Sequence, residues 1–495
     1  MTGPADVPAL SLAAVASAGR TLDAPFALTL AGAGANPAAA LTVRCVSVLR
    51  LLPGRRLVAG VEVAGTSAVL KLFLGGGARR YCQRERRGCA LLAAAGVATP
   101  TVLDELCAPA GSAVAAYGLL FEYLPEARPL DAADDAGVAA AAAELGRLHE
   151  HGCRHRDLHL DNFLRVAGSA RPFVIDGDAV RRSRTGPLSP GRSRDDLAVF
   201  CAQRSALADR RLEPVLESYA QGRGWPPERA RGERLVELAA AVRRQRRARL
   251  RRYRRKCQRD CSEFVCERGW RRYRVAVRAA WEEGLADLVE TLWRAPESVF
   301  DGAEILKAGN SATVIRVPLG AGSCVVKRYN LKGPWHALRR NLRGMTRFRR
   351  SWVYGQALNL LEIPGARPLA LMERRFGPLR GVAYLILSDL GSTDLAGEVD
   401  RVGLADERLE QVVQLFRSLQ AAGLSHGDTK ATNFLVSGGK LHLVDLDAMR
   451  DGAHGLADDA ARFLDNFAHL PEVRERVRIA LAKVPGIDLR KGAGR

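Results

Sequence analysis

Short runs of alternating or β-branched hydrophobic residues mark the first half of the chain, with two longer helical patterns among them. Such runs predict strands, and these fall at 41–49, 56–63, 67–73 and 118–124. Residues 78–95 and 131–151 have the composition and spacing of helices. The first of these helices is followed by Gly96 and Pro100, which are typical stop signals.

The second half repeats this order of elements. Strands are predicted at 304–317, 323–329, 382–387 and 441–444, and helices at 335–361 and 406–422. In the last helix, Leu409, Val412, Val413 and Phe416 share one face, as expected for an amphipathic helix. Both halves therefore read as strands, helix, strand, helix, loop and strand, which indicates a long-period duplication and not a short-repeat solenoid.

Residues 1–40 are rich in Ala, Gly and Pro, and we predict a partly ordered N-terminal extension there. The two similar halves give predicted domains at 41–240 and 298–495. Between them, at 241–297, the run Arg243–Lys256 contains ten Arg or Lys in fourteen positions and no acid. No Pro or Gly interrupts it, which favours a helix. We predict an α+β fold of two tandem domains joined by a basic helical segment.

One motif appears once in each half. His155, Asp157 and Asn162 follow the spacing H-x-D-x4-N, and a later Asp176 ends an apolar run. The second half has the same spacing at His426, Asp428 and Asn433, followed by Asp445, again at the end of an apolar run. Asp and Asn provide the oxygen ligands that Mg²⁺ prefers. The repeated set predicts two sites for phosphoryl transfer.

The order of these residues suits that chemistry. Asp157 and Asp428 are the predicted catalytic groups, because an aspartate can accept or orient the proton of the attacking hydroxyl. The predicted Mg²⁺ ligands are the Asn and the later Asp of each half, namely Asn162, Asp176, Asn433 and Asp445. The two histidines are expected to pack the loop against the following strand.

A lysine on an upstream strand completes each set. Lys71 and Lys327 can reach the phosphates of ATP as point charges, and Glu85 in the next helix can hold Lys71. The separations from first to second half are 256 residues for the lysines, 271 for the catalytic Asp pair and 269 for the later Asp pair. Ordinary variation in loop length absorbs these differences.

The two halves also differ. The first lacks a glycine-rich phosphate loop, so Arg55 and Arg56 are candidates to cover the phosphates. The second has a turn at Gly309 and Asn310 for that purpose, and Lys430 could contact the transferred phosphate.

Alignment of the halves places Ser351 where the first has Glu85. Either Glu362 or Glu373 then anchors Lys327, or this half is weak or inactive. Two extra acids, Asp178 and Asp447, follow the metal aspartates and could either join the coordination or face solvent.

Taken together, these residues resemble the bacterial lipopolysaccharide core kinases, the heptose and Kdo kinases with a protein-kinase-like fold. The similar strings are 148–164 with 174–178, and 425–435 with 443–447, together with 307–313 and 326–330. The resemblance covers about 41–200 and 300–470. It implies two protein-kinase-like bilobal domains, ATP and Mg²⁺ as cofactors, and a lipopolysaccharide core acceptor.

Charge and composition limit the class of partner and the cellular location that we expect for the protein. The chain of 495 residues has 75 Lys and Arg against 54 Asp and Glu, a net charge of +21, which implies an anionic partner. A hydrophobic content of 47% excludes wholesale disorder, and no apolar run reaches the roughly 18 residues of a membrane span. Ten cysteines without a secretory signal indicate reduced thiols. We expect a cytoplasmic protein that can attach to the inner face of the inner membrane.

The favoured function is an ATP-dependent kinase of the lipopolysaccharide inner core, with heptose as acceptor. One alternative has a single active half with a pseudokinase scaffold. Another has a different small-molecule or protein hydroxyl as acceptor, because a fold does not fix its substrate. A non-enzymatic alternative is a basic membrane or nucleic-acid adaptor. Arg243–Lys256 is either a solvated linker or a surface for anionic lipid; nucleic acid is disfavoured, since no nucleic-acid motif accompanies it.

Overall fold

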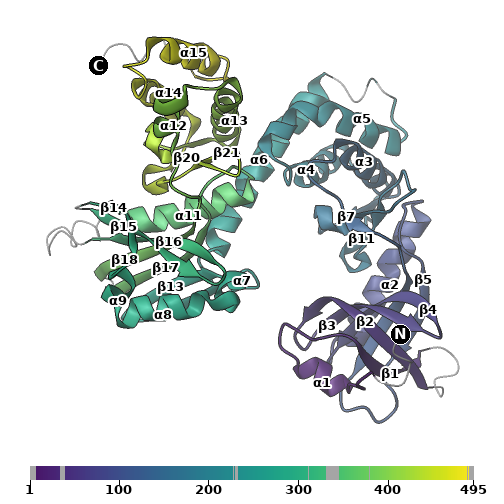
Figure 1. Ribbon diagram of the computed structural model, residues 1–495. Helices are drawn as coiled ribbons and strands as arrows, with labels where there is room; N and C mark the ends of the chain where they lie inside the picture. Colours follow the sequence, from purple (N-terminus) through teal and green to yellow (C-terminus); the bar gives the residue numbers. More distant parts are fainter. Residues whose placement is uncertain are drawn as a thin grey trace. The chain divides into compact units, whose positions relative to one another are not determined.

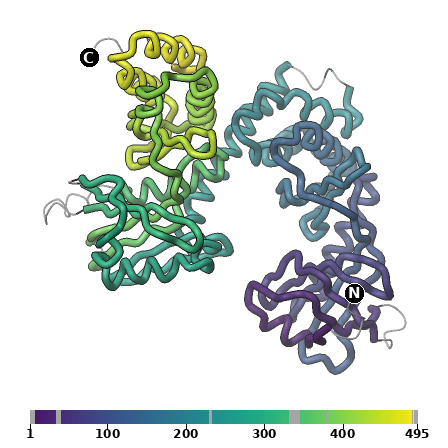
Figure 2. Tube along the Cα trace, in the orientation of Figure 1, coloured from purple at the N-terminus to yellow at the C-terminus, as the bar shows by residue number. Residues whose placement is uncertain are grey.

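The computed structural model describes residues 7–33, 40–226, 228, 232–309, 311–330, 345–377, 379–487 and 489. The chain divides into two compact units (Figures 1 and 2). Unit 1 comprises Met1–Arg204 and Ala208–Gln245, and unit 2 comprises Ser205–Leu207 and Arg246–Arg495. Helices and strands are mixed in both units, which confirms the α+β class.

Unit 1 begins with a closed barrel of strand order β1-β2-β3-β4-β6-β5. The strands are β1 (Phe26–Gly32), β2 (Ala40–Leu52), β3 (Arg56–Val63), β4 (Thr66–Leu74), β5 (Val102–Cys107) and β6 (Ala116–Glu122). The barrel interior is filled by alternate apolar side chains such as Phe26, Leu28, Leu57 and Leu70.

The prediction of an N-terminal extension at 1–40 is therefore wrong for its described part. The short helix α1 (Leu12–Ser17) packs Leu12 and Val15 into the barrel core, and β1 pairs with both β2 and β5 to close the barrel. Phe26, Leu28 and Leu30 alternate with smaller residues, a pattern typical of a strand. The Ala, Gly and Pro content of the segment obscured this pattern.

Helix α2 (Ala78–Ala94) packs between the barrel and the loop that follows Val174. The approach is close, since a Cβ on Gly88 would lie 1.8 Å from the carbonyl oxygen of Gly177. Only glycine allows the helix to meet this loop so tightly. The predicted helix and the predicted metal loop are thus fixed to each other.

The rest of unit 1 is mainly helical. Its helices are α3 (Asp135–Glu150), α4 (Pro190–Cys201), α5 (Leu212–Gly222) and the first part of α6 (Glu233–Lys256). Five short strands carry the loops between them: β7 (Arg128–Pro129), β8 (Cys153–His155), β9 (Phe163–Arg165), β10 (Phe173–Val174) and β11 (Val180–Arg182). Leu145, Leu197, Tyr219 and Val242 share one hydrophobic core.

Unit 2 contains a seven-stranded sheet of order β12-β13-β17-β18-β16-β15-β14. The strands are β12 (Phe264–Arg268), β13 (Arg272–Val277), β14 (Glu304–Ala308), β15 (Ala312–Leu319), β16 (Gly322–Tyr329), β17 (Pro368–Phe376) and β18 (Leu379–Ser388). The interval 241–297 differs from the predicted helical linker, because β12 and β13 belong to this sheet.

Helices cover both faces of the sheet (Figure 1). Short α7 (Arg278–Ala280) leads into α8 (Ala286–Arg294), which packs with Met372 and Ile386 on one face; α9 (Pro296–Phe300) follows. Helix α11 (Arg347–Leu360) packs with Leu371 and Leu385 on the other face. The first part of the predicted helix 335–361 lies outside the described residues.

A helical region completes unit 2. Its helices are α12 (Leu395–Val402), α13 (Asp406–Ala422), α14 (Leu456–Asp465) and α15 (Pro471–Leu481). Its short strands are β19 (Leu424–Ser425), β20 (Phe434–Ser437), β21 (Lys440–Leu443) and β22 (Arg450–Asp451). The predicted helix 406–422 coincides with α13, and its apolar face, including Val412 and Phe416, is buried.

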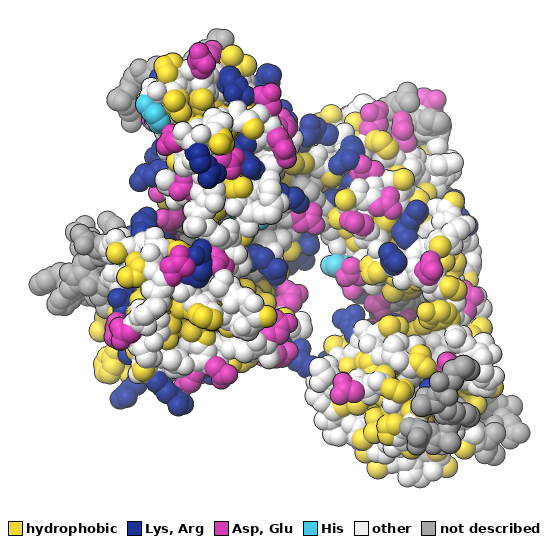
Figure 3. Space-filling view, viewed as in Figure 1, with side chains coloured by type: hydrophobic (Ala, Val, Ile, Leu, Met, Phe, Trp, Pro, Cys, Tyr) yellow, Lys and Arg dark blue, Asp and Glu magenta, His cyan; other side chains and the backbone are white. Residues whose placement is uncertain are grey.

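The basic run Arg243–Lys256 forms the second half of α6. Leu250 is buried in the core of unit 2, and Arg254 lies 2.8 Å from Asp451 and stacks on Tyr354. The run is thus partly packed and is not a solvated linker. Basic side chains are spread over the visible face of both units and interspersed with acids (Figure 3). None of the described helices has the length and apolar character needed to cross a membrane.

Candidate active site

The loop after β8 holds the first motif. His155 is buried, and its Nε2 lies 3.0 Å from the carbonyl oxygen of Ile175, so the imidazole ties this loop to the segment that carries Asp176. The Asn162 Nδ2 donates to the backbone oxygen of Asp157 at 2.8 Å. The Asp157 side chain is exposed, as a group that meets an incoming hydroxyl must be. His155 therefore has the structural place expected of it.

Lys71 on β4 is the centre of an ion-pair network. Its Nζ lies 2.6 Å from Glu85 Oε2 and 2.7 Å from Asp176 Oδ1. The Glu85 carboxylate also accepts backbone N–H groups of Gly177 at 3.1 Å and Asp178 at 2.9 Å. Glu85 in α2 thus holds both the lysine and the metal loop, and the expected Lys71–Glu85 pair is present.

Asp176 stands in the left-handed region, with φ 68° and ψ 58°. Burial acts to raise the pKa of its carboxyl, but Lys71 and Arg56 outweigh this effect and the pKa is lowered. Arg56 Nη1 lies 3.7 Å from Asp176 Oδ1. One of the two arginines considered for the phosphates is therefore beside the predicted metal ligand, in a site that keeps Asp176 ionised.

The second motif lies after β19. His426 is buried, and its Nε2 lies 3.0 Å from the carbonyl oxygen of Val444; burial lowers its pKa. The Asn433 Nδ2 donates to Asp428, at 2.8 Å to the backbone oxygen and 3.3 Å to Oδ2. Asp459 on α14 accepts N–H groups of His426 at 2.7 Å and Gly427 at 2.9 Å. A buried carboxylate thus fixes the loop that presents Asp428.

Lys327 on β16 has two carboxylate partners from a single loop. Its Nζ lies 2.7 Å from Asp445 Oδ1 and 3.0 Å from Asp447 Oδ2. Asp447 is buried, and its Oδ1 accepts hydroxyl hydrogens from Tyr329 and Ser351, each at 2.6 Å. Asp447 thus supplies the second carboxylate that Glu85 supplies in unit 1.

Electrostatics keep Asp447 charged despite its burial. Burial acts to raise the pKa of the carboxyl, but Lys327, the Ser351 and Tyr329 hydroxyls and Arg347 together lower it. Arg347 Nη2 lies 2.9 Å from Asp447 Oδ2. The site therefore holds an ionised aspartate that is fully enclosed by donors.

Sequence comparison of the halves suggested other anchors for Lys327, and both suggestions are wrong. Glu373 is buried but pairs with Arg349 at 2.9 Å and Arg375 at 3.3 Å. Glu362 lies just beyond the end of α11 with φ 57° and is no partner of Lys327 among the described ion pairs. Asp447, the extra acid after the predicted metal ligand Asp445, is buried beside Lys327 and does not face solvent.

The donor set of each site suits Mg²⁺. Each Asn donates its amide N–H to the backbone oxygen of the predicted catalytic aspartate, which leaves its side-chain carbonyl oxygen as an acceptor. Within the described residues no cluster of three or more His, Cys, Asp or Glu side chains could hold a metal alone. Mg²⁺ is commonly bound by one or two protein ligands together with water and substrate phosphates. One Asn and one Asp per site therefore fit this ion.

Two other predicted residues, Gly309 and Lys430, are not part of the ion-pair network of Lys327 among the described contacts. The Gly309 carbonyl accepts from Asn330 Nδ2 at 3.3 Å, and Asn310 lies outside the described residues. The Lys430 side chain is exposed beside the catalytic loop. Gly309 and Lys430 are therefore both accessible to a ligand.

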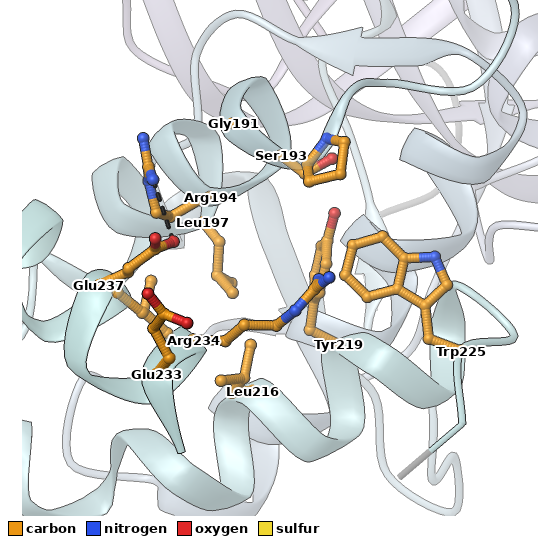
Figure 4. A pocket seen from close by; sticks show the side chains of 12 residues that line it. Gly191, Ser193, Arg194, Leu197, Leu216, Tyr219, Trp225, Glu233, Arg234 and Glu237 are labelled. Atoms are coloured by element: carbon orange, nitrogen blue, oxygen red, sulfur yellow. Dashed lines mark hydrogen bonds and ion pairs between the residues drawn. The ribbon is translucent and has the colours of Figure 1, made fainter. Parts of the chain in front are cut away.

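A cavity of about 340 Å³ lies among α4, α5 and α6 of unit 1, apart from the predicted site residues (Figure 4). Its lining includes Trp225, on which Arg234 stacks, and the ion pair of Arg194 with Glu237 at 3.1 Å. None of the predicted site residues lines it. The cavity is separate from the candidate active site.

Comparison with known proteins gives a match to a family model and similarity to solved structures. Residues 290–456 match the lipopolysaccharide kinase (Kdo/WaaP) family. No curated protein matches the chain. A structure of WaaP in complex with acyl carrier protein is similar, with 24% identity and a TM-score of 0.31, over 41% of this chain and 88% of that chain.

The matched span includes Lys327, Asp428, Asn433 and Asp445, and it lies within unit 2. The similarity of residues 290–456 to the lipopolysaccharide kinase (Kdo/WaaP) family indicates a phosphotransferase with an alcohol group as acceptor.

Proposed function

We propose that the protein uses ATP and Mg²⁺ to phosphorylate a heptose hydroxyl of the lipopolysaccharide inner core. The observation that carries this proposal is the network of Lys327, Asp445 and Asp447 beside the Asp428–Asn433 loop, inside the span that matches the family. The family description supports lipopolysaccharide as the acceptor, and the resemblance supports heptose.

In this proposal each side chain of unit 2 has one task. Asp428 orients the acceptor hydroxyl and takes up its proton, and Lys327 neutralises ATP phosphates. Asn433 and Asp445 would hold Mg²⁺, which would supply positive charge against the phosphates of ATP. Gly309 and Asn310 would cover the phosphates, and Lys430 would contact the transferred group.

Unit 1 would repeat these tasks. Asp157 would act on the hydroxyl, Asn162 and Asp176 would hold Mg²⁺, and Lys71, held by Glu85, would contact ATP. The proposal thus includes two kinase-like bilobal domains in tandem. It is supported by the same lysine–aspartate distance of 2.7 Å and the same Asn-to-loop distance of 2.8 Å in both units.

A second candidate has one catalytic unit and one scaffold unit. The family match falls in unit 2, and the lysine anchors of the two units differ, which favours a division of labour. In either case we propose that the protein works at the inner face of the inner membrane. The exposed arginines on the packed basic run, Arg247, Arg251 and Arg255, would face anionic lipid.

The test is ATP-dependent phosphate transfer to purified core oligosaccharide. We expect Asp428→Asn to lower kcat by about 10²–10⁴-fold, because a positioned general base contributes about that much. Asp157→Asn tests unit 1 in the same assay, and loss in only one variant identifies the catalytic unit. Asp161→Asn is a matched control, because Asp161 is an exposed acid of the same loop. Absence of both ATP binding and transfer in the wild type would overturn the proposal.

A further inference from the structure

Two adjacent hairpin turns of the unit 2 sheet carry exposed apolar side chains. Trp270, in the turn between β12 and β13, is 65% exposed. Phe376 and Leu379, at the turn between β17 and β18, are 63% and 49% exposed, and they pair across that turn. We call these three residues the aromatic tip. Single exposed apolar residues are ordinary, but a contiguous group at one edge marks a surface for a partner.

Hydrogen bonds and a ring contact join the two turns of the aromatic tip. The two turns are joined by hydrogen bonds from Gly377 N to Trp270 O and from Arg375 N to Arg271 O, both of 2.9 Å. The Trp270 ring meets Phe376 edge-on, with centroids 5.8 Å apart. A Cβ on Gly377 would lie 2.8 Å from the indole, so only glycine seats the ring there. One side of the indole is thus fixed and the other side is left in water.

Arginines surround the aromatic tip. Arg268 and Arg271, on either side of Trp270, are exposed. The Arg268 guanidinium donates to the backbone oxygen of Gln258 at 2.6 Å, which joins the turn to the segment after α6. Arg255 and Arg259 at that end of α6 are also exposed. The aromatic tip is therefore continuous with the end of the basic run.

The acids of this region do not cancel that charge. The carboxylates nearest in sequence each have a basic partner, in the pairs Glu267–Arg274 (2.7 Å), Glu263–Lys256, Asp260–Arg278 (2.9 Å) and Glu373–Arg349 (2.9 Å). Glu373 is, in addition, fully buried. The charge presented to an approaching surface is consequently positive.

We propose that the aromatic tip inserts into the headgroup region of an anionic lipid bilayer, with the surrounding arginines on the lipid phosphates. Indole rings favour the membrane–water interface, because their apolar body and polar N–H suit its two sides. Basic residues near an anionic surface add about 1 kcal/mol each. Stable attachment needs two such signals together, and this surface has both.

The size and shape of the aromatic tip favour a bilayer over a protein partner. A stable protein interface buries about 800 Å² on each side and involves 20–30 residues. Three apolar side chains on two projecting turns are far fewer, yet they are enough to enter the soft interfacial region of a bilayer. The proposal needs neither ATP nor catalysis, so it stands or falls separately from the kinase activity.

The experiment is co-sedimentation of the full chain with vesicles of phosphatidylcholine alone or mixed with phosphatidylglycerol, without ATP. We expect binding to the anionic vesicles, weakened when NaCl rises from 50 to 500 mM. Trp270→Ala should lower the partition coefficient about tenfold, or about 1.4 kcal/mol, and Arg271→Gln about fivefold. Val402→Ala is the control, because Val402 is 70% exposed on α12, in the helical region of unit 2.

A second readout reports insertion directly. Brominated lipids should quench part of the tryptophan fluorescence of the wild type, and Trp270→Leu should remove that part. Thermal unfolding of each variant checks that the fold is kept. Absence of vesicle binding, equal loss in Val402→Ala and Trp270→Ala, or binding to an oligonucleotide that depends on Trp270 while vesicles are ignored would each overturn the proposal.

Discussion

Units 1 and 2 hold corresponding lysines with carboxylates that come from different elements. In unit 1 the second carboxylate is Glu85 on α2, which reaches across to Lys71 at 2.6 Å. In unit 2 the residue on the corresponding helix is Ser351, and the carboxylate is that of Asp447, two positions after Asp445. In both units the lysine pairs at 2.7 Å with the aspartate predicted to bind metal, but the second carboxylate comes from a helix in unit 1 and from a loop in unit 2.

This difference changes what each lysine depends on. Displacement of α2 would remove Glu85 from Lys71 and also break its two hydrogen bonds to the metal loop. In unit 2 both partners of Lys327 belong to the metal loop, and α11 contributes only hydroxyl and guanidinium donors. We expect the geometry of the lysine in unit 2 to tolerate movement of its helix better.

The largest expected effect is that of Asp447→Asn. The change leaves Lys327 and Arg347 beside a neutral amide in a buried site, and loss of one partner of a buried ion pair costs about 3–5 kcal/mol. Urea unfolding followed by hydrogen exchange in unit 2 measures this cost.

Asp178→Asn is the matched control in unit 1. Asp178 has the same place after its metal aspartate, but its carboxylate pairs with the half-buried Arg84 at 2.5 Å and not with Lys71. A partly exposed pair contributes about 1 kcal/mol or less. Equal losses in the two variants would show that the anchors do not differ.

The next effect is a rescue. Ser351→Glu in the Asp447→Asn background returns a carboxylate to the helix position that Glu85 has in unit 1. We expect recovery of about 1–3 kcal/mol of the lost stability, because hydrogen bonds to charged groups contribute about that much. Ser351→Ala in the same background should recover nothing. Failure of the glutamate to exceed the alanine would show that a carboxylate on α11 cannot reach Lys327.

The sequence predicted a large part of this picture. Strand–helix order, both H-x-D-x4-N loops and the Lys71–Glu85 pair followed from local patterns and from repetition. Ser351 at the position of Glu85 was also visible in the sequence. That Asp447 takes the place of Glu85 as partner of Lys327 was not predictable, because this contact depends on the conformation of the loop. Asp445 in that loop has a left-handed backbone conformation, which the sequence pattern does not indicate.

Two segments were misread for a related reason. Phe26–Gly32 falls within the predicted partly ordered extension at 1–40, because Ala, Gly and Pro dominate the composition of that segment. Phe264–Arg268 and Arg272–Val277 fall within the predicted basic helical linker at 241–297, because arginine dominates the composition of that interval. In both cases the strand is completed by pairing with residues far along the chain, and composition carries no information about such partners.

A smaller effect is expected from acid. The pKa values of Asp176 and Asp447 are lowered in the folded protein, where burial opposes and the lysines favour the charged form. Their stabilisation is fully present above the ordinary aspartate value of 3.8 and is lost as the pH falls through the lower folded value. Each unit of lowering is worth about 1.4 kcal/mol.

Hydrogen exchange between pH 5 and pH 3 measures this loss in each unit. We expect Asp447→Asn to reduce the acid sensitivity of unit 2 and leave that of unit 1 unchanged. Asp459 opposes this trend, because burial raises its pKa and its neutral form gains in acid. An unchanged acid response of unit 2 in Asp447→Asn would contradict the assignment of a charged Asp447.

The smallest effect tests a single hydroxyl. Tyr329 stands two residues after Lys327, and the equivalent residue after Lys71 is Phe73. Tyr329→Phe removes the 2.6 Å hydrogen bond to Asp447 but keeps the ring contact with Phe348, so we expect a loss of about 1–2 kcal/mol in unit 2. Phe73→Tyr in unit 1 should bring no matching gain, because Glu85 already accepts two backbone N–H groups. A stabilised Phe73→Tyr would mean that the two anchors use the same donors after all.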